Sequence, residues 1–279
     1  MRNTALLVHT CDRYELLYKG FSYFFSKYWD FNAACNCYFA TEEKKVSING
    51  FKNLQAGKRE WADRLLFLLK EKIKEKYVIY FQEDMWLTQK TDAGFFNRLF
   101  ELAEKNNWQE VKLHSAGIYK THPTDIYING FNVARIDNEQ SDFLMSHQVT
   151  LWNKEFLQRQ LYKGEHPWRN ERKATKRLKQ LSPEIFHIDY FEENGNREIN
   201  LNKQPVARSG YYTVSVNGSF NDNIRRYIPE LLMIDEPYAR KLEYNYTHQL
   251  VHDGQQRPRK TDMFKSIKDW LLGKVSGLK

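Results

Sequence analysis

The sequence has only three cysteines in 279 residues, and all of them lie in its first 37 positions. Cys11, Cys35 and Cys37 are an odd number, and no second group of cysteines follows that would complete a zinc site. We therefore interpret them as reduced thiols in the core. The pattern favours a protein that folds without disulfides or a structural metal.

Long apolar runs are also missing. The apolar run near the N-terminus, from Ala5 to Val8, is too short for a signal peptide, and no later stretch approaches the length that crosses a bilayer. We expect a cytoplasmic protein. There is no internal repeat and no low-complexity tract. With 41% hydrophobic residues, the chain suffices for one large α/β domain, or for one domain with an appendage.

Acidic residues are outnumbered by basic ones, 35 against 43, which leaves a net charge of +8. Such a charge suggests a polyanionic partner: a nucleic acid, an anionic membrane surface or a phosphorylated substrate. The most basic stretch, from Arg169 to Lys179, also fits a solvated amphipathic helix. No zinc pattern, helix-turn-helix pattern or base-stacking platform is evident, so nucleic acid is the least favoured partner.

A buried strand is predicted from Tyr77 to Phe81, where five β-branched or aromatic residues follow one another. Gln82, Glu83 and Asp84 come directly after it. In an open α/β sheet, ligands bind outside the carboxyl ends of the strands, so these side chains would face a substrate or a metal. The alternative is that the two carboxylates cap the next helix or pair with an arginine across a loop.

A second polar loop follows the first predicted strand. Thr10, Asp12 and Arg13 would share a sheet edge with Glu83 and Asp84 if the two strands are parallel. Asp12 would then accept hydrogen bonds from a base or ribose, and Arg13 would meet phosphate. For Asp12 the strong alternative is an N-cap on the following helix.

The helical period from Trp61 to Ile73 predicts a crossover helix that leads into the central strand, and Arg64 lies on it. Lys58 and Arg59 precede this helix at the end where the helix dipole attracts anions. They would suit a bound anion, although two solvated basic residues explain them as well.

Strand and helix patterns alternate up to His114, which predicts an α/β fold with a mostly parallel central sheet flanked by helices. Asn129-Gly130 then separates two short alternating runs and predicts a β-hairpin. We expect an antiparallel second half and a C-terminal helical extension. The predicted domains are residues 1–235 and 236–279.

The order of these elements resembles the GT-A-fold glycosyltransferases, in particular those of bacterial surface polysaccharide and lipopolysaccharide loci. The resemblance covers roughly residues 4 to 220, and no single motif in it is specific. The segments that carry it are Thr10-Cys11-Asp12-Arg13, Trp61 with Arg64 to Leu69, Tyr77 to Asp84, Gln148 to Leu157, and Glu165-His166-Pro167-Trp168 with Glu171.

The resemblance implies transfer of a sugar, with inversion, from a nucleoside diphosphate sugar such as a UDP-sugar to a glycan or lipid-linked acceptor in polysaccharide biosynthesis. The donor-binding residues implied are Thr10, Asp12, Arg13, Lys58, Arg64, Gln82 and Glu83. The acceptor-binding residues implied are Gln148, Trp152 and Trp168.

The family binds Mn²⁺ or Mg²⁺ through an aspartate-any-aspartate motif. Here Gln82 occupies the first position of that motif, while Asp84 keeps the last one and Glu83 lies between them. Asp84 and Glu83 are hard oxygen ligands, whereas Gln82 is a weak neutral one. This departure leaves open an inactive module that binds a nucleotide sugar or glycan without turnover.

An inverting enzyme needs a general base near the acceptor, and a carboxylate with a raised pKa suits that role. The candidates are Glu165, Glu171 and Asp142. We favour Glu165, because it lies in a loop between aromatic and basic groups where a sugar ring would stack on Trp168. The alternative for Glu165 is an exposed loop residue after a helix.

The C-terminus has the pattern of an amphipathic helix with one apolar and one basic side. The apolar positions are Met263, Phe264, Ile267, Trp270, Leu271 and Val275. The basic ones are Lys260, Lys265, Lys268, Lys274 and Lys279. Such a helix would lie on an anionic membrane, which would place the protein peripherally at the inner face of the plasma membrane. The alternative is a helix that packs on the domain or on a second subunit.

Overall fold

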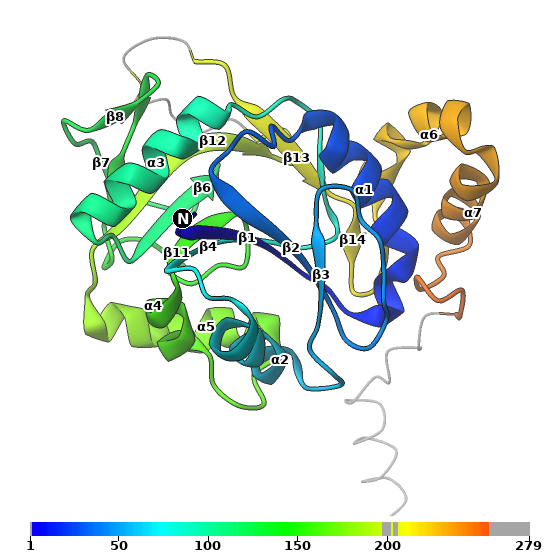
Figure 1. The fold of residues 1–279 in the computed structure, drawn as a ribbon, viewed down its shortest axis with the longest axis horizontal. Coiled ribbons are helices and arrows are strands. Elements are labelled where there is room, and N and C mark those ends of the chain that lie inside the picture. The colour runs from blue at the N-terminus through cyan, green and yellow to red at the C-terminus, as the bar shows by residue number, and fades with distance from the viewer. Residues whose placement is uncertain (1, 116, 197–201, 203–205, 257–279) are drawn as a thin grey trace, which may run out of the picture.

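The computed structural model describes residues 2–115, 117–196, 202 and 206–256. An eleven-stranded sheet forms its centre, in the order β3-β2-β1-β4-β11-β6-β12-β10-β7, with β13 joined to both β12 and β5 (Figure 1). The strands are β1 Thr4–His9, β2 Cys35–Thr41, β3 Lys52–Gln55, β4 Tyr77–Phe81, β5 Met85–Leu87, β6 Glu110–His114, β7 Thr121–His122, β10 Ala134–Ile136, β11 Thr150–Asn153, β12 Ile185–Glu193 and β13 Ser209–Thr213.

The first four strands of this order are parallel, as predicted. Strand β11 runs antiparallel between β4 and β6, whereas β12 is parallel to both β6 and β13. The second half is therefore mixed: β7, β10 and β11 are antiparallel to their neighbours, but β12 is not antiparallel to β6. The long connection between β6 and β12 provides the crossover that a parallel pair requires.

Both faces of the central strands are buried. In β1, Leu6 and Val8 belong to one hydrophobic cluster, and Ala5 and Leu7 belong to another, because successive side chains point to opposite faces. Helices α1 and α3 cover the first face, and α2, α4 and α5 cover the second (Figure 1). The helices are α1 Glu15–Tyr28, α2 Trp61–Phe67 with a π-helical continuation at Leu68–Lys72, α3 Ala93–Asn106, α4 Lys154–Gln160, α5 Pro167–Leu181, α6 Ile228–Ile234 and α7 Glu236–Thr247.

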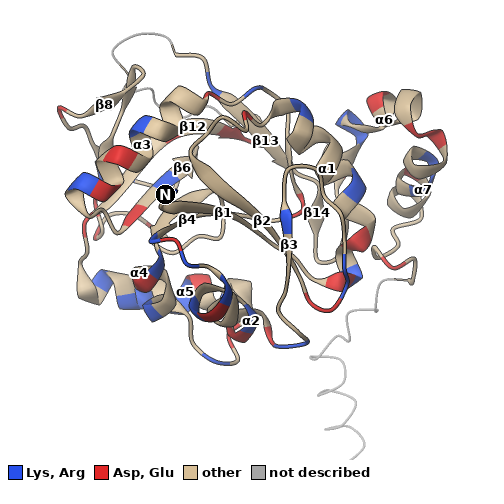
Figure 2. Cartoon of the chain, in the orientation of Figure 1, with Lys and Arg blue, Asp and Glu red and all other residues tan. Residues whose placement is uncertain are grey.

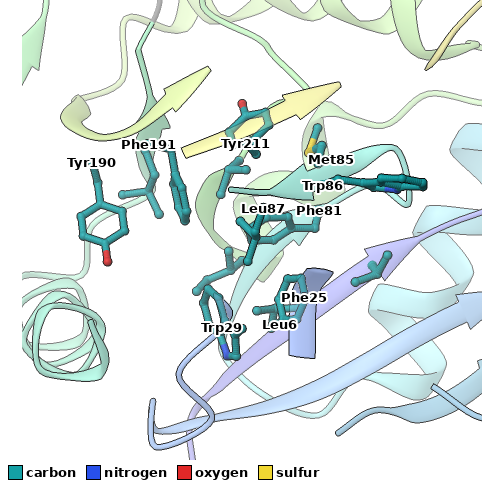
Figure 3. Close-up of a cluster of buried hydrophobic side chains, with 14 of the residues drawn as sticks. Leu6, Phe25, Trp29, Phe81, Met85, Trp86, Leu87, Tyr190, Phe191 and Tyr211 are labelled. Atoms are coloured by element: carbon teal, nitrogen blue, oxygen red, sulfur yellow. The ribbon is translucent and has the colours of Figure 1, made fainter. Parts of the chain in front are cut away.

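Aromatic packing anchors the chain just beyond β4. Trp86 is fully buried, its ring stacks on Phe24 at 5.5 Å between centroids, and its indole N–H donates to the carbonyl of Glu83 at 3.0 Å. Phe81, at the end of β4, packs edge-on against Phe25 at 5.6 Å (Figure 3). The loop that carries Glu83 and Asp84 is thus tied to the core on both sides.

Gly20 leaves the space on α1 that Trp86 occupies. A Cβ atom on residue 20 would lie 2.1 Å from the Cη2 atom of Trp86. Helix propensity alone predicts that Gly20→Ala stabilises the protein by about 1 kcal/mol. We expect the opposite, a loss of about 1–3 kcal/mol in the free energy of unfolding, because the ring has to move within a packed core. Urea unfolding measures this, with Ser22→Ala on the same helix as the control. A Gly20→Ala protein as stable as the parent would contradict the packing of Trp86.

Helices α6 and α7 lie beside α1 at one edge of the molecule (Figure 1). The hydroxyl of Tyr238 accepts a hydrogen bond from the backbone N–H of Gly20 at 2.9 Å and donates one to the carbonyl of Leu16 at 2.8 Å. Lys19 also pairs with Asp235. Helix α7, which lies in the predicted extension, thus packs on α1. The domain division at residue 235 stays a prediction.

The predicted hairpin at Asn129-Gly130 is confirmed. Strands β8 Tyr127–Ile128 and β9 Phe131–Asn132 pair antiparallel across it, and both turn residues have positive φ angles, 48° and 89°. A second short hairpin joins β14 Ser215–Val216 to β15 Ser219–Phe220 through Asn217-Gly218. This second turn reaches the cavity described below.

Charges of both signs share most helix surfaces (Figure 2). On α3, for example, Arg98 pairs with Glu101 at 3.0 Å. Among the helices that the structure describes, none is both long and apolar enough to cross a membrane. The predicted amphipathic helix between Met263 and Val275 lies outside the described residues and stays a prediction.

Candidate functional site

A cavity of about 790 Å³ opens at the carboxyl ends of β1 and β4. Its walls come from the loops after these strands, from the start of α2, from the segment before β11, from the start of α5 and from the turn between β14 and β15. This is the edge of a parallel sheet where ligands are expected. The volume is in the range of pockets that hold small-molecule ligands.

Glu83 and Asp84 form an acidic floor in this cavity. The backbone N–H of Val214 donates to the carbonyl of Asp84 at 2.9 Å, which fixes this part of the loop. Burial, and then the charge of Asp84, raise the pKa of Glu83 well above its usual range, and the opposing charges of Arg64 and Arg13 do not cancel this rise. Burial raises the pKa of Asp84 from 3.8 to about 7. Within the described part of the chain, the buried Oδ1 atom of Asp84 has no hydrogen-bond partner. The protein's own cations therefore leave this carboxyl pair incompletely compensated.

Arg64 is the best-fixed cation of the cavity. Its Nε donates to Nε2 of His9 at 3.0 Å, and its Nη1 pairs with Glu42. Because Nε2 of His9 accepts, the proton of that ring lies on Nδ1, next to the hydroxyl of Tyr80 at 3.3 Å. Burial, and then the charge of Arg64, lower the pKa of His9 well below its usual value. His9 is thus a neutral support that orients Arg64.

Arg13 and Arg59 add positive charge to the cavity lining. The Nη2 atom of Arg13 donates to the hydroxyl of Tyr14 at 3.1 Å, and the guanidinium of Arg59 lies 4.2 Å from the ring centre of Phe67. Both guanidinium groups lie over aromatic rings, that of Arg13 at 4.8 Å from the ring centre of Tyr14, and neither forms an ion pair with a described residue. Their charges are free to meet an anionic ligand.

Glu171 faces the cavity from α5. Its Oε1 accepts a hydrogen bond from the backbone N–H of His147 at 3.0 Å. Burial raises the pKa of Glu171 against the opposing effect of this bond. Gln148 also lines the cavity, and its Oε1 accepts from the hydroxyl of Tyr211 at 2.9 Å. Trp168 is 53% exposed and offers an open ring at the cavity wall.

The structure thus brings together nine of the predicted catalytic, donor-binding, acceptor-binding and metal-binding residues. They are Thr10, Arg13, Arg64, Gln82, Glu83, Asp84, Gln148, Trp168 and Glu171. Thr10 is buried, however, and its hydroxyl forms a hydrogen bond of 2.6 Å with the hydroxyl of Tyr18.

Two of the predicted donor-binding residues are not among the described residues that line the cavity. The carboxylate of Asp12 accepts hydrogen bonds of 2.9 to 3.0 Å from the backbone N–H groups of Glu42, Glu43 and Lys44. It therefore clamps the loop after β2, and the helix is not capped by Asp12. Lys58 is exposed and lies 3.2 Å from Glu43 in an ion pair.

Trp152 and Asp142 are also outside the described cavity lining. Trp152 lies in β11 opposite Val78, and its ring is buried in the hydrophobic cluster beneath α2, α4 and α5. Asp142 is exposed on the surface. The first is part of the core, and the second lies on the surface away from the described cavity lining.

Glu165 is buried behind the cavity wall rather than exposed in a loop. Its carboxylate accepts hydrogen bonds from Asn170 at 2.7 Å and from Arg177 at 3.2 Å. Burial raises its pKa, but the bonds from Arg177 and Asn170 outweigh this effect, and the pKa is lowered. A general base of raised pKa is therefore not found at Glu165, whereas Glu171, six residues later, has the raised pKa and faces the cavity.

Arg59, which the sequence placed beside Lys58 as a residue suited to a bound anion, does line the cavity. Other contributors escaped the sequence analysis, among them His9, His147 and the turn at Asn217-Gly218. His9 ends the first strand and His147 precedes Gln148, so their positions carried a weak signal. The turn lies more than 130 residues beyond Asp84, and no local pattern links the two.

The oxygen atoms at the floor suit a divalent cation. Among the described residues, no group of three or more His, Cys, Asp or Glu side chains is placed to hold a metal ion alone. Mg²⁺ is usually held by one or two carboxylates together with substrate phosphates. Glu83 and Asp84 provide such a pair, and the unpaired Oδ1 of Asp84 fits a cation ligand.

No protein-family model matches the chain, and no curated protein matches it. Several solved structures are similar. The structure of S. aureus TarS has 9% identity and a TM-score of 0.45, and the match covers 88% of this chain and 43% of that one. TarS 1–349 in complex with UDP has 10% identity and a TM-score of 0.46, with 88% and 71% covered. UDP-glucose pyrophosphorylase with UDP-glucose has 9% identity and a TM-score of 0.39, with 68% and 91% covered. The chain thus spans less than half of the longer TarS structure.

Proposed function

We propose that this protein is a glycosyltransferase that moves a sugar from a nucleoside diphosphate sugar to a hydroxyl group of a glycan or lipid-linked acceptor. One observation carries the proposal: a single cavity holds two incompletely compensated carboxyl groups and three arginines, of which Arg13 and Arg59 form no ion pair with a described residue. A diphosphate together with a divalent cation would satisfy both sets of groups at once. The sequence resemblance described above points to the same ligand.

Glu83 and Asp84, with Gln82 as a weak third ligand, would hold Mn²⁺ or Mg²⁺ on the cavity floor. When bound, the cation supplies positive charge to the diphosphate leaving group. Arg64 is held by His9 and Glu42, so its guanidinium does not have to reorganise as negative charge develops on the leaving group. Arg13 and Arg59 would add to this charge from the cavity lining.

Glu171 takes the role of the general base in this proposal. Its raised pKa favours proton uptake from an acceptor hydroxyl, and it lies on the same wall as Trp168, on which a sugar ring would stack. One base is what an inverting transfer requires. The proton that Glu171 takes up leaves to solvent after the glycoside has formed. We also propose that this sugar transfer is a step in surface polysaccharide synthesis.

A donor panel tests this function. The full chain is incubated with UDP-glucose, UDP-GlcNAc and GDP-mannose, each with Mn²⁺, with Mg²⁺ or with EDTA, and release of UDP or GDP is measured. We expect release from one nucleotide class that depends on the metal and is lost in Asp84→Asn. Thermal stabilisation by a donor without release would indicate the binding module instead. If no donor releases UDP or GDP and no donor stabilises the protein, the proposal is wrong.

A further inference from the structure

A buried chain of hydrogen bonds connects Glu165 to the cavity wall. Asn170 is completely buried, and its Nδ2 donates to the carbonyl of Gln160 at 2.8 Å and to Oε2 of Glu165 at 2.7 Å. Both partners are acceptors, since the pKa of Glu165 is lowered and its carboxylate is ionised. The two amide hydrogens of Asn170 are therefore used, and its amide cannot be flipped without losing both bonds.

This orientation determines the tautomer of His147. The Oδ1 atom of Asn170 lies 3.1 Å from Nε2 of His147, and a carbonyl oxygen can only accept. Nε2 must therefore carry a proton. Burial lowers the pKa of His147 to about 3 against the opposing hydrogen bond with Asn170, so the ring is neutral and holds one proton. The other nitrogen, Nδ1, keeps a bare lone pair.

The ring is also fixed in place. Trp61 packs edge-on against it, with 4.4 Å between the ring centroids, and the backbone N–H of His147 is bonded to Glu171. Both Trp61 and His147 line the cavity. Within the described part of the chain, Nδ1 has no hydrogen-bond partner. It also does not belong to the polar side-chain atoms that are fully buried without a partner. A ligand in the cavity can therefore reach this lone pair.

We propose that Nδ1 of His147 is an obligate hydrogen-bond acceptor that selects a hydroxyl group of the sugar substrate, and that Asn170 and Glu165 are positioning residues that keep it so. The identity of the ligand as a sugar rests on the proposed function, whereas the tautomer does not. A neutral ring of this tautomer accepts one hydrogen bond from the cavity and donates none. A substrate with a hydroxyl at this point leaves no polar atom unpaired, and an analogue without it leaves the lone pair desolvated.

The first experiment needs no substrate. Long-range ¹H–¹⁵N correlation spectra of the full chain, labelled at histidine and assigned with His147→Leu, report the protonation of both ring nitrogens. We expect His147 to carry its proton on Nε2, with no titration between pH 5.5 and 8.5. Asn170→Asp keeps the acceptor oxygen but turns its other oxygen toward two acceptors, Glu165 and the carbonyl of Gln160, so the new carboxyl group should itself take up a proton. The ring should then keep its proton on Nε2 and should not titrate in this range. A proton on Nδ1 in the parent protein would overturn the inference.

Asn170→Leu tests whether Asn170 controls the tautomer. Leucine removes the acceptor without adding a buried charge, so the ring should exchange between both tautomers. A ring that keeps its proton on Nε2 alone in Asn170→Leu would show that Asn170 does not control it, and would overturn the positioning role.

The second experiment tests hydroxyl selection. Binding and turnover are compared for UDP-glucose, or for whichever donor of the panel is active, and for its monodeoxy analogues. We expect one analogue to have roughly 10- to 100-fold weaker binding, seen in KM more than in kcat, and this penalty to vanish in His147→Leu. His147→Asn should restore part of it, because the amide oxygen lies near the position of Nδ1.

The same donors, added to the labelled protein, should shift the Nδ1 resonance of His147, whereas the matching deoxy analogue should not. Donors that bind but leave this resonance and the deoxy pattern unchanged would overturn the inference while the proposed function stands. Failure of every nucleotide sugar to bind would overturn the proposed function and hydroxyl selection together, although the tautomer would still be decided by the first experiment.

Discussion

Asp84→Asn should reduce turnover by roughly a thousandfold or more and should also make the metal-free protein more stable above pH 7. Turnover falls because the asparagine amide provides no charge to hold a divalent cation. Stability rises because the folded protein holds the proton of Asp84 more tightly than the unfolded chain does, with a pKa raised from 3.8 to about 7. This contribution to stability is fully present below pH 4 and is lost as the pH rises through about 7. The amide cannot ionise, so the variant avoids the loss.

The gain should be about 1–3 kcal/mol at pH 8 and near zero at pH 4, because Asp84 is partly exposed and shares its environment with Glu83. Urea unfolding in EDTA at both pH values measures it. Asp142→Asn is the matched control, since Asp142 is exposed and lies outside the described cavity lining. Full turnover in Asp84→Asn, or the same stability difference at both pH values, would rule out this account of the carboxyl pair.

Glu171→Gln should lower turnover by roughly 100- to 10,000-fold and leave donor binding close to that of the parent protein. Glutamine keeps the shape of the side chain and can still accept from the N–H of His147, but it cannot take a proton from the acceptor. Because the pKa of Glu171 is raised, the rate of the parent protein should increase with pH through a value above the usual range of glutamate. In Glu171→Gln this rise should disappear when the rates are measured at a saturating concentration of Mn²⁺, which keeps Glu83 and Asp84 ionised. Steady-state rates from pH 4.5 to 8.5 test both points.

Glu165→Gln is the matched control for the base, because it makes the same change six residues away and behind the cavity wall. The pKa of Glu165 is lowered in the folded protein, so its ionised form stabilises the fold above the usual pKa of glutamate, and this contribution is lost as the pH falls through the lowered value. We therefore expect Glu165→Gln to lose stability at neutral pH and to keep the pH-dependent rise in rate. Loss of that rise in Glu165→Gln but not in Glu171→Gln would return the role of base to Glu165.

The sequence by itself determined the parallel half of the sheet and the edge at which the cavity lies. Five β-branched or aromatic residues from Tyr77 to Phe81 favour a strand that is buried on both faces, and such a strand carries whatever follows it to the sheet edge. This placed Glu83 and Asp84 correctly beside Arg13. The period of α2 likewise brought Arg64 into the same cavity. These inferences depend on spacing along one segment, which is a local property.

Only the tertiary structure decided which of several similar side chains face the cavity. Glu165 and Glu171 lie six residues apart, and the packing of α5 turns the first toward Asn170 and Arg177 and the second toward the ligand space. The rotation of a helix about its axis depends on the elements it packs against, which the local sequence does not contain. For the same reason Trp152 became a core residue, because β11 turns its ring toward the cluster beneath α4 and not toward the cavity.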